Sequence, residues 1–515
     1  MTRTELARLL WVVLEGPTID PEADALLRVG AGGVVLFSRN ITGAAQLREL
    51  TAELRGRARG PLRIAIDHEG GHVARIGAPL TRFPSSMAIA AAGSEDIAEA
   101  CARAAARELA WLGIDVNLAP VLDVAADPRN PSIGVRSFGS DPAQVARYGA
   151  ATIRGYRAGG VAATAKHFPG HGRTAIDPHH ALPVVGGGID ELRRRDLPPF
   201  RAALEAGVEL VMATHAAYDG ITDGLPSSLS PRVMIELLRG ELGFDGPVVT
   251  DAMVMRAIAD DHGVADASAR AIIAGADVAM PLVEQPAALA ALESALADGR
   301  LPRRRLADAL RRSDALDRAL ATPAPRLERL PDAAHAALAL DVARRSLTRP
   351  SPGSLLPLAT GTSVAVVEFA ARRPSPIEED VPPGVAASLG AALAGCGARV
   401  TEVVLSGTPE AMAAERAAAV DAASGAEVVV CATRDVFLWD DDRRLVAELV
   451  AGDRPTILVA LRNPYDLAVL PAAAEGIAAY ADVPATLQAL AEALTGRAGF
   501  PGSLPARLTV PAEVA

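Results

Sequence analysis

The sequence predicts an α/β protein, namely a (β/α)8 barrel of the TIM type followed by a smaller α/β layered domain. Three observations lead to this prediction. Short apolar runs alternate with helical segments up to residue 280. The same alternation resumes after a proline-rich stretch, near residue 360. The chain of 515 residues is also too long for one ordinary compact domain.

The apolar runs before residue 280 have the character of strands buried on both faces, which is typical of a parallel sheet covered by helices. They are Leu10–Leu14, Gly33–Phe37, Leu62–Asp67, Val116–Val121, Val161–Lys166, Leu210–Thr214, Pro247–Asp251 and Ala276–Met280. Helical segments between them include Ala44–Ala58, Asp96–Leu112, Pro142–Ala158, Glu191–Ala206, Pro231–Leu242 and Val264–Ala274. Eight such strands favour a closed barrel, with an open doubly wound sheet as the alternative.

We expect the barrel to occupy residues 1–320 and a linker to occupy residues 321–350. The linker holds a proline-rich piece, Thr322–Pro325, and one helix, Asp332–Leu347. The C-terminal α/β domain would then span residues 351–515. Its expected strands are Val364–Phe369, Val400–Leu405, Glu427–Cys431, Thr456–Leu461 and Gly476–Tyr480.

Composition narrows the classes of function. A net charge of -11 argues against a nucleic acid as the main partner. No apolar stretch is long enough to span a membrane, and no secretory signal is evident, so a cytoplasmic enzyme is expected. The three cysteines are far apart and predict neither disulfides nor a zinc site. No GxGxxG motif opens a helix, and we expect no metal or other cofactor. The oligomeric state stays open.

Polar residues stand where a barrel enzyme needs them, because barrel active sites form at the carboxyl ends of the strands. The ends of the predicted strands carry Arg39, Asp67, Asp123, Lys166, His167, His215 and Asp251. Eight of the nine histidines also precede residue 263. Histidines scattered over a surface would not follow strand ends in this way.

The loop Lys166–Pro183, KHFPGHGRTAIDPHHALP, contains four histidines. Within it, Asp177 stands two residues before His179. A carboxylate bonded to an imidazole fixes its tautomer and raises its pKa, so the pair can donate a proton and later accept one. The alternative is a rigid loop whose histidines cap backbone groups.

Asp251 ends a strand that should be buried on both faces, where a charge is costly unless it is used. It is predicted to be a nucleophile, although it could instead cap the next helix. A carboxylate nucleophile with a separate proton donor is what retaining glycoside cleavage requires. The donor is usually a second carboxylic acid, so a His–Asp pair departs from that plan.

The sequence resembles glycoside hydrolase family 3, in particular its β-N-acetylglucosaminidase branch with two domains. The resemblance rests on KHFPGHG followed by D-x-H, and on the segments Gly32–Asn40, Ile66–Ile76, Asn130–Pro142, Asp196–His215 and Ser227–Met255. It implies that Asp251 is the nucleophile, His179 the acid/base and Asp177 its partner. It also implies that the sugar is held by Asp67, Arg75, Arg136, Lys166, His167 and Met212. The family's usual DQEGGR reads DHEGGH here, with His68 and His72, which puts fine specificity in question.

The resemblance predicts an oligosaccharide substrate with a terminal β-linked GlcNAc, such as peptidoglycan fragments, chitin oligosaccharides or glycoconjugates. A phosphorylase or a broader β-glycosidase is the alternative, since a neutral histidine donor repels phosphate less than a carboxylate does. A remote alternative is a metal-dependent barrel hydrolase with ligands among His167, His171, His179, His215 and Asp251. A third possibility is a sugar-binding protein without activity, which the retention of Asp177, His179 and Asp251 opposes.

Overall fold

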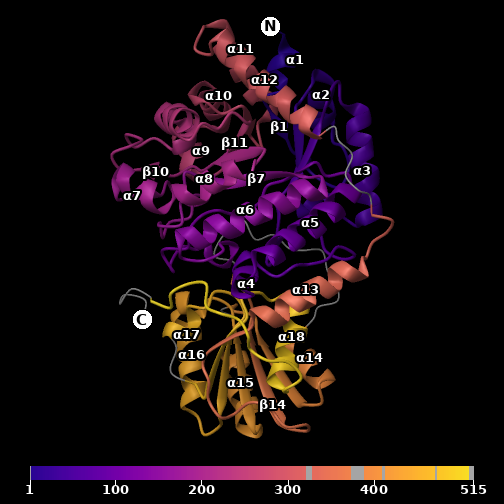
Figure 1. The fold of residues 1–515 in the computed structure, drawn as a ribbon, viewed down its shortest axis with the longest axis vertical. Helices are drawn as coiled ribbons and strands as arrows, with labels where there is room; N and C mark the ends of the chain where they lie inside the picture. Colours follow the sequence, from indigo (N-terminus) through magenta and orange to yellow (C-terminus); the bar gives the residue numbers. More distant parts are fainter. Residues whose placement is uncertain (1, 321–326, 373–387, 409–411, 470–472, 510–515) are drawn as a thin grey trace.

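The protein is described by a computed structural model that covers residues 2–320, 327–372, 388–408, 412–469 and 473–509. The proline-rich piece Thr322–Pro325 lies outside these residues. Figure 1 shows a barrel with a smaller layered domain below it, and α13 (Ala333–Ser346) running between the two. This helix confirms the one predicted at Asp332–Leu347.

The barrel consists of eight parallel strands that are paired in the order β1-β2-β3-β6-β7-β9-β11-β12. An isolated parallel bridge between Leu10 and Ala279 joins its first and last strands. All eight predicted strands are therefore confirmed, and the sheet is closed rather than open. The strands are β1 (Trp11–Val12), β2 (Gly33–Leu36), β3 (Arg63–Ile66), β6 (Val116–Asn117), β7 (Ala162–Phe168), β9 (Leu210–Ala213), β11 (Val248–Ala252) and β12 (Val278–Met280).

Helices cover the outside of the barrel. They include α2 (Pro21–Val29), α3 (Ala44–Arg57), α5 (Glu95–Trp111), α6 (Pro142–Gly159), the π-helix η4 (Arg232–Glu241), α10 (Val264–Ala274), α11 (Gln285–Ala297) and α12 (Arg303–Leu320). Their starts are marked in the sequence: Asp20 and Asp141 cap α2 and α6 and are each followed by a proline. The predicted helix Glu191–Ala206 is in fact two helices, α7 (Gly188–Arg195) and α8 (Leu197–Glu205). Proline belongs in the first turn of a helix, so Pro198 starts α8 instead of continuing α7.

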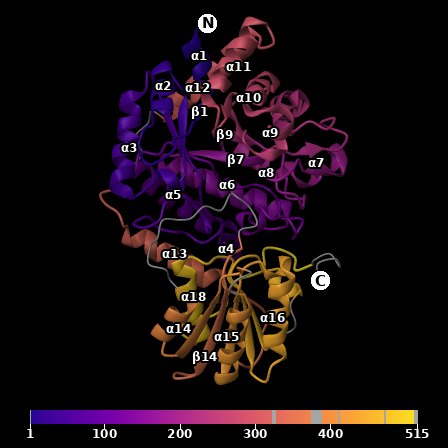
Figure 2. The same ribbon diagram turned by 180° about the vertical axis from the view of Figure 1, so that it is seen from behind.

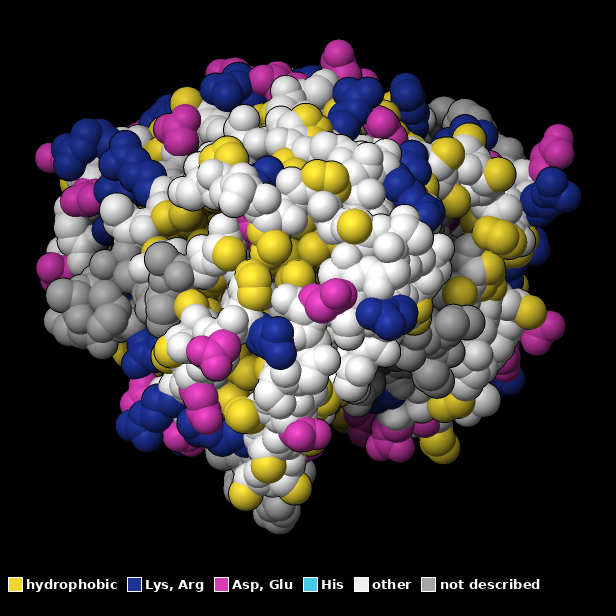
Figure 3. Space-filling model, turned by 90° about the horizontal axis from the view of Figure 1, so that it is seen from below, with side chains coloured by type: hydrophobic (Ala, Val, Ile, Leu, Met, Phe, Trp, Pro, Cys, Tyr) yellow, Lys and Arg dark blue, Asp and Glu magenta, His cyan; other side chains and the backbone are white. Residues whose placement is uncertain are grey.

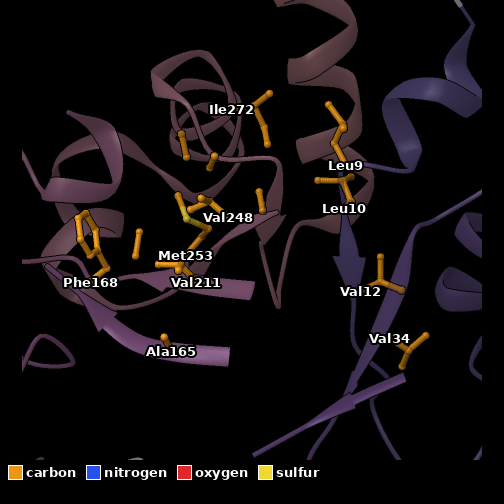
Figure 4. Packing of buried hydrophobic residues seen from close by; sticks show 14 of the residues in the cluster. Leu9, Leu10, Val12, Val34, Ala165, Phe168, Val211, Val248, Met253 and Ile272 are labelled. Carbon is orange, nitrogen blue, oxygen red and sulfur yellow. The ribbon is translucent and has the colours of Figure 1, made fainter. Parts of the chain in front are cut away.

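Side chains along the barrel strands alternate between two buried layers. Val34, Val211 and Val248 belong to the outer layer, which packs against the helices and is drawn in part in Figure 4. Their neighbours Val35, Met212 and Val249 belong to the inner cluster that fills the barrel. Continuing this alternation places the side chains at the ends of three strands on the inner face: Asp67, Lys166 and Asp251.

The smaller domain has a six-stranded sheet in the order β13-β18-β17-β16-β14-β15. Its five parallel strands confirm the predicted runs: β14 (Ser363–Phe369), β15 (Arg399–Leu405), β16 (Val428–Thr433), β17 (Thr456–Ala460) and β18 (Glu475–Ala478). The sixth strand, β13 (Thr348–Ser351), is not among the predicted strands. It pairs antiparallel with β18 at the sheet edge and is partly exposed, so it has no apolar run. The predicted boundaries at residues 320 and 350 stay predictions.

The carboxyl ends of the second sheet point at the barrel. Helix α4 (Ser86–Ala91) lies at the junction in both ribbon views (Figures 1 and 2). The hydroxyl of Ser85, which caps this helix, donates to the carbonyl of Tyr480 just after β18, at 2.6 Å. Seen from below, the described side chains on the visible face mix acidic, basic and apolar groups, and no field of one charge sign stands out among them (Figure 3). Within the described residues, no helix is both long and apolar enough to cross a membrane.

Candidate active site

One pocket at the carboxyl end of the barrel brings together all nine residues that the sequence predicted for the site. They are Asp67, Arg75, Arg136, Lys166, His167, Asp177, His179, Met212 and Asp251. Five of them come from barrel strands or the residue directly after a strand, and the other four from the loops that follow. Apolar side chains of Phe37, Val254, Met255 and Leu282 complete the wall. Ordered polar groups in an otherwise apolar concavity are typical of a small-molecule site.

A buried network of charges forms the pocket floor. The Lys166 ammonium lies 2.6 Å from a carboxylate oxygen of Asp67 and 2.6 Å from one of Glu69. Glu69 also accepts two hydrogen bonds from the Arg136 guanidinium, both of 2.8 Å. Arg75 lies 3.7 Å from the second oxygen of Asp67. Lys166 and Arg136 are thereby fixed in place with their charges compensated.

Glu69 is the residue that sequence analysis missed, although it lies inside the DHEGGH segment. Burial alone would raise the pKa of its carboxyl, but Arg136 and Lys166 hold that pKa far below its ordinary value. Its side chain is only 3% exposed. A buried carboxylate between two cations orients both of them, so Glu69 supports the pocket without lining it.

We expect Glu69→Ala to destabilise the protein by about 3–5 kcal/mol, because it leaves two buried cations without their shared partner. Urea unfolding followed by circular dichroism would measure the loss. Glu205→Ala, which removes a glutamate from the end of α8 on the barrel surface, is the control and should change stability by less than about 0.5 kcal/mol. Equal stabilities of the two variants would contradict the assigned role of Glu69.

His167 is oriented by a buried carboxylate behind it. Its Nδ1 lies 2.6 Å from Asp123, which also accepts the backbone N–H groups of His167 and His171 at 3.1 and 2.8 Å. Nδ1 therefore carries the donated hydrogen, and Nε2 is left for the pocket. Among the described residues, Asp123, His167 and His171 are close enough to hold a metal ion. These hydrogen bonds already account for the positions of Asp123 and His167, and the absence of a metal stays a prediction.

The predicted dyad is formed. His179 Nδ1 lies 2.7 Å from Asp177 Oδ1, which also accepts the backbone N–H of His179 at 2.9 Å. The Asp177 side chain is 1% exposed and that of His179 is 22% exposed. The dyad loop is held to the barrel where the N–H of Ala257 donates to the carbonyl of Pro178 at 3.1 Å. This geometry leaves Nε2 of His179 available for proton transfer.

Asp251 lies among imidazoles. Burial alone would raise the pKa of its carboxyl, but His167, His215 and His179 together lower it, so Asp251 is ionised at neutral pH. The Ala252 N–H donates to Asp251 Oδ1 at 2.8 Å. His215 is buried, which lowers its pKa, and its Nε2 lies 3.2 Å from the Ala252 carbonyl. Since that carbonyl can only accept, Nε2 of His215 is the donor in this hydrogen bond, which fixes the backbone beside Asp251.

His68, His72 and His180 lie outside the pocket lining. His68 lines a second cavity, to which α5 also contributes, and His72 lies near Arg462 of the smaller domain. His180 is exposed. The two histidines of the DHEGGH segment therefore do not line the pocket; both belong to the hairpin formed by β4 (His68–Gly70) and β5 (Val73–Ala74).

A closed barrel with an ionised carboxylate, a His–Asp dyad and a cationic floor in one pocket has the parts of a glycoside hydrolase. Residues 1–315 match the glycosyl hydrolase family 3 N-terminal domain. The chain belongs to this family, and the resemblance seen in the sequence is confirmed.

The chain is similar in sequence to two β-hexosaminidases and in structure to a family 3 β-N-acetylglucosaminidase. β-Hexosaminidase A of Pseudoalteromonas piscicida is 35% identical over 382 residues, which are 67% of this chain and 64% of that protein. The chain thus spans less than two thirds of that relative. A β-hexosaminidase of Pseudomonas aeruginosa is 40% identical over 265 residues, 51% of this chain and 78% of that one. The solved structure of a family 3 β-N-acetylglucosaminidase from Paenibacillus sp. str. FPU-7 has a TM-score of 0.93 at 35% identity, covering 99% of this chain and 100% of that one.

Proposed function

We propose that this protein is a retaining β-N-acetylhexosaminidase that releases terminal, non-reducing β-linked GlcNAc. The observation that carries the proposal is the joint presence of the His179–Asp177 dyad and the Asp251 carboxylate in one pocket. A proton donor and a carboxylate nucleophile are the two groups that the retaining reaction needs. The names of the relatives support the class of sugar.

The reaction would proceed in two steps. Asp251 attacks the anomeric carbon and forms a covalent glycosyl ester, while His179 Nε2 gives its proton to the leaving oxygen as the glycosidic bond breaks. The imidazole then takes a proton from water, whose oxygen attacks the anomeric carbon and releases Asp251. Asp177 stabilises the imidazolium at Nδ1 while Nε2 carries the proton.

The floor of the pocket would hold the sugar. Asp67 can accept from sugar hydroxyls, while Lys166 and Arg136 donate. His167 presents Nε2, which accepts from a hydroxyl when the imidazole is neutral. Met212 supplies an apolar contact from the inner face of the barrel. Among natural substrates, we propose peptidoglycan fragments with a terminal GlcNAc, ahead of chitin oligosaccharides and glycoconjugates.

A panel of aryl β-glycosides tests the choice of sugar. We expect the aryl β-GlcNAc to be cleaved at least about 100-fold faster, in kcat/KM, than the aryl β-glucoside. Hydrogen bonds made to the 2-acetamido group of GlcNAc are lost when glucose has a hydroxyl group in its place. Each substrate should be assayed in water and with added inorganic phosphate, and the product identified by mass. Equal rates would indicate a broad β-glycosidase, and GlcNAc 1-phosphate as the main product would indicate a phosphorylase.

A further inference from the structure

The loop that carries Arg136 lies between the pocket and the smaller domain. It runs from Asn130 to Gly139 and follows β6 in the barrel. On its inner side, Glu69 fixes the Arg136 guanidinium, as described above. On its outer side, it is covered by residues that follow the carboxyl ends of β16, β17 and β18.

The first outer contact joins Gly134 to Asn463. A Cβ atom at Gly134 would lie 2.4 Å from Asn463 Oδ1 and 2.7 Å from its Nδ2, so any larger residue would displace the loop or the amide. The amide is held in place, because its Nδ2 donates to buried Asp435 at 2.7 Å. Gly134 also has a φ of +42°, which favours glycine.

The second outer contact is apolar. Val135, directly before Arg136, lies in one buried cluster with Phe437, Tyr465 and Tyr480 of the smaller domain. The loop's last residue, Gly139, is pressed on the backbone near the C-terminus: a Cβ there would lie 2.3 Å from the carbonyl oxygen of Pro505. The smaller domain therefore contacts the loop on both sides of Arg136.

These contacts lie at the carboxyl edge of the second sheet. In open α/β sheets, ligands bind outside the carboxyl ends of the strands. In this protein, that edge of the second sheet is covered by the barrel loop, with Asp435 and Asn463 supplying the polar groups. At the carboxyl edge of this sheet, the barrel loop thus occupies the place where other open α/β sheets bind a ligand.

We propose that Asn463 is a positioning residue for substrate binding: backed by Asp435, it fixes the backbone at Gly134 and so places the Arg136 guanidinium in the pocket. This inference rests on the proposed role of Arg136 in holding the sugar. Arg136 would contact the substrate both before and during the reaction, so its displacement should raise KM more than it lowers kcat.

The test compares Gly134→Ala, Asn463→Ala and the double variant in the full chain, with aryl β-GlcNAc as the substrate. Gly134→Ala should raise KM about tenfold with kcat within about threefold, because its methyl group displaces the loop. Removing the Asn463 amide removes the clash with that methyl but leaves the backbone strain of alanine at a φ of +42°, so Gly134→Ala should raise KM by only about threefold in the Asn463→Ala background. Asn463→Ala alone should raise KM about threefold.

Two further variants separate the outcomes. Arg349→Met breaks a largely buried pair with Glu475, at the amino end of β18, and should lower the melting temperature without changing KM. Arg136→Met should raise KM at least about tenfold. The inference is overturned if Gly134→Ala keeps the wild-type KM, or raises it equally in both backgrounds. If Gly134→Ala does not fold, an unchanged KM in Asn463→Ala overturns it. If Arg136→Met keeps the wild-type KM, the proposed role of Arg136 itself is wrong.

Discussion

Asp251→Asn is expected to abolish turnover while leaving the protein folded. The amide cannot form the glycosyl ester, so kcat/KM should fall by at least about 10⁴-fold, which corresponds to about 5.5 kcal/mol of transition-state stabilisation. Folding should persist because asparagine has nearly the same shape and its oxygen can still accept from the Ala252 N–H. Steady-state kinetics on aryl β-GlcNAc and thermal unfolding by circular dichroism would measure the two effects.

The matched control is Asp245→Asn, which neutralises a carboxylate six residues earlier in the chain. Asp245 pairs with Arg311 and Arg312 on the outside of the barrel, and its side chain is 64% exposed. This variant should keep wild-type kinetics. Near-normal turnover by a folded Asp251→Asn protein would mean that the nucleophile is another group.

His179→Gly is expected to slow cleavage in proportion to the basicity of the leaving group. A sugar alkoxide must be protonated as it leaves, so its release should fall by about 10²–10⁴-fold. A dinitrophenolate needs no proton, so attack by Asp251 should continue at nearly the wild-type rate. The second step lacks its base, and the glycosyl-enzyme on Asp251 should therefore accumulate. A leaving-group series combined with intact-protein mass spectrometry would detect both effects.

Two variants and one added anion sharpen this test. His180→Gly removes the adjacent, exposed imidazole and should behave as wild type. Asp177→Ala should show a weaker form of the His179→Gly pattern, because the imidazole remains but loses its 2.7 Å partner. Azide should speed turnover of His179→Gly by attacking the ester directly and yielding a β-glycosyl azide. Uniform loss across the series without an adduct would make His179 a structural residue.

The barrel could be predicted because its signals are local. The strands are apolar runs, and polar residues follow most of them. The alternation of side chains turns three of these residues inward: Asp67, Lys166 and Asp251. Strand β13 has neither signal, because it is a partly exposed edge strand that contains Pro350 and pairs with a strand more than 100 residues away. Its pairing depends on the backbone of β18, which no pattern around Thr348 reveals.

The sequence predicted those site residues that belong to recognised motifs, but not those whose role depends on contacts made in the folded protein. The motifs of family 3 indicated nine residues that line one pocket, including Arg136, from segments far apart in the chain. They did not indicate Glu69, whose role depends on two cations that lie 67 and 97 residues later in the sequence. His72 lies one residue beyond Gly71 in the same segment, yet the hairpin turns it towards Arg462. The contacts of Glu69 and His72 are therefore visible only in the structure, because their partners lie far away in the sequence.

The bridge between Leu10 and Ala279 has a consequence for the synthesis of this protein. The first strand emerges from the ribosome with one edge unpaired, and its partner on that side follows only after some 270 further residues have been made. At about 5–20 residues per second, that edge stays open for roughly 14–54 s. Contacts of such long range also slow the folding of a complete chain. Among the barrel strands, β1 thus waits longest for its second partner, which leaves it open to mispairing for the longest time.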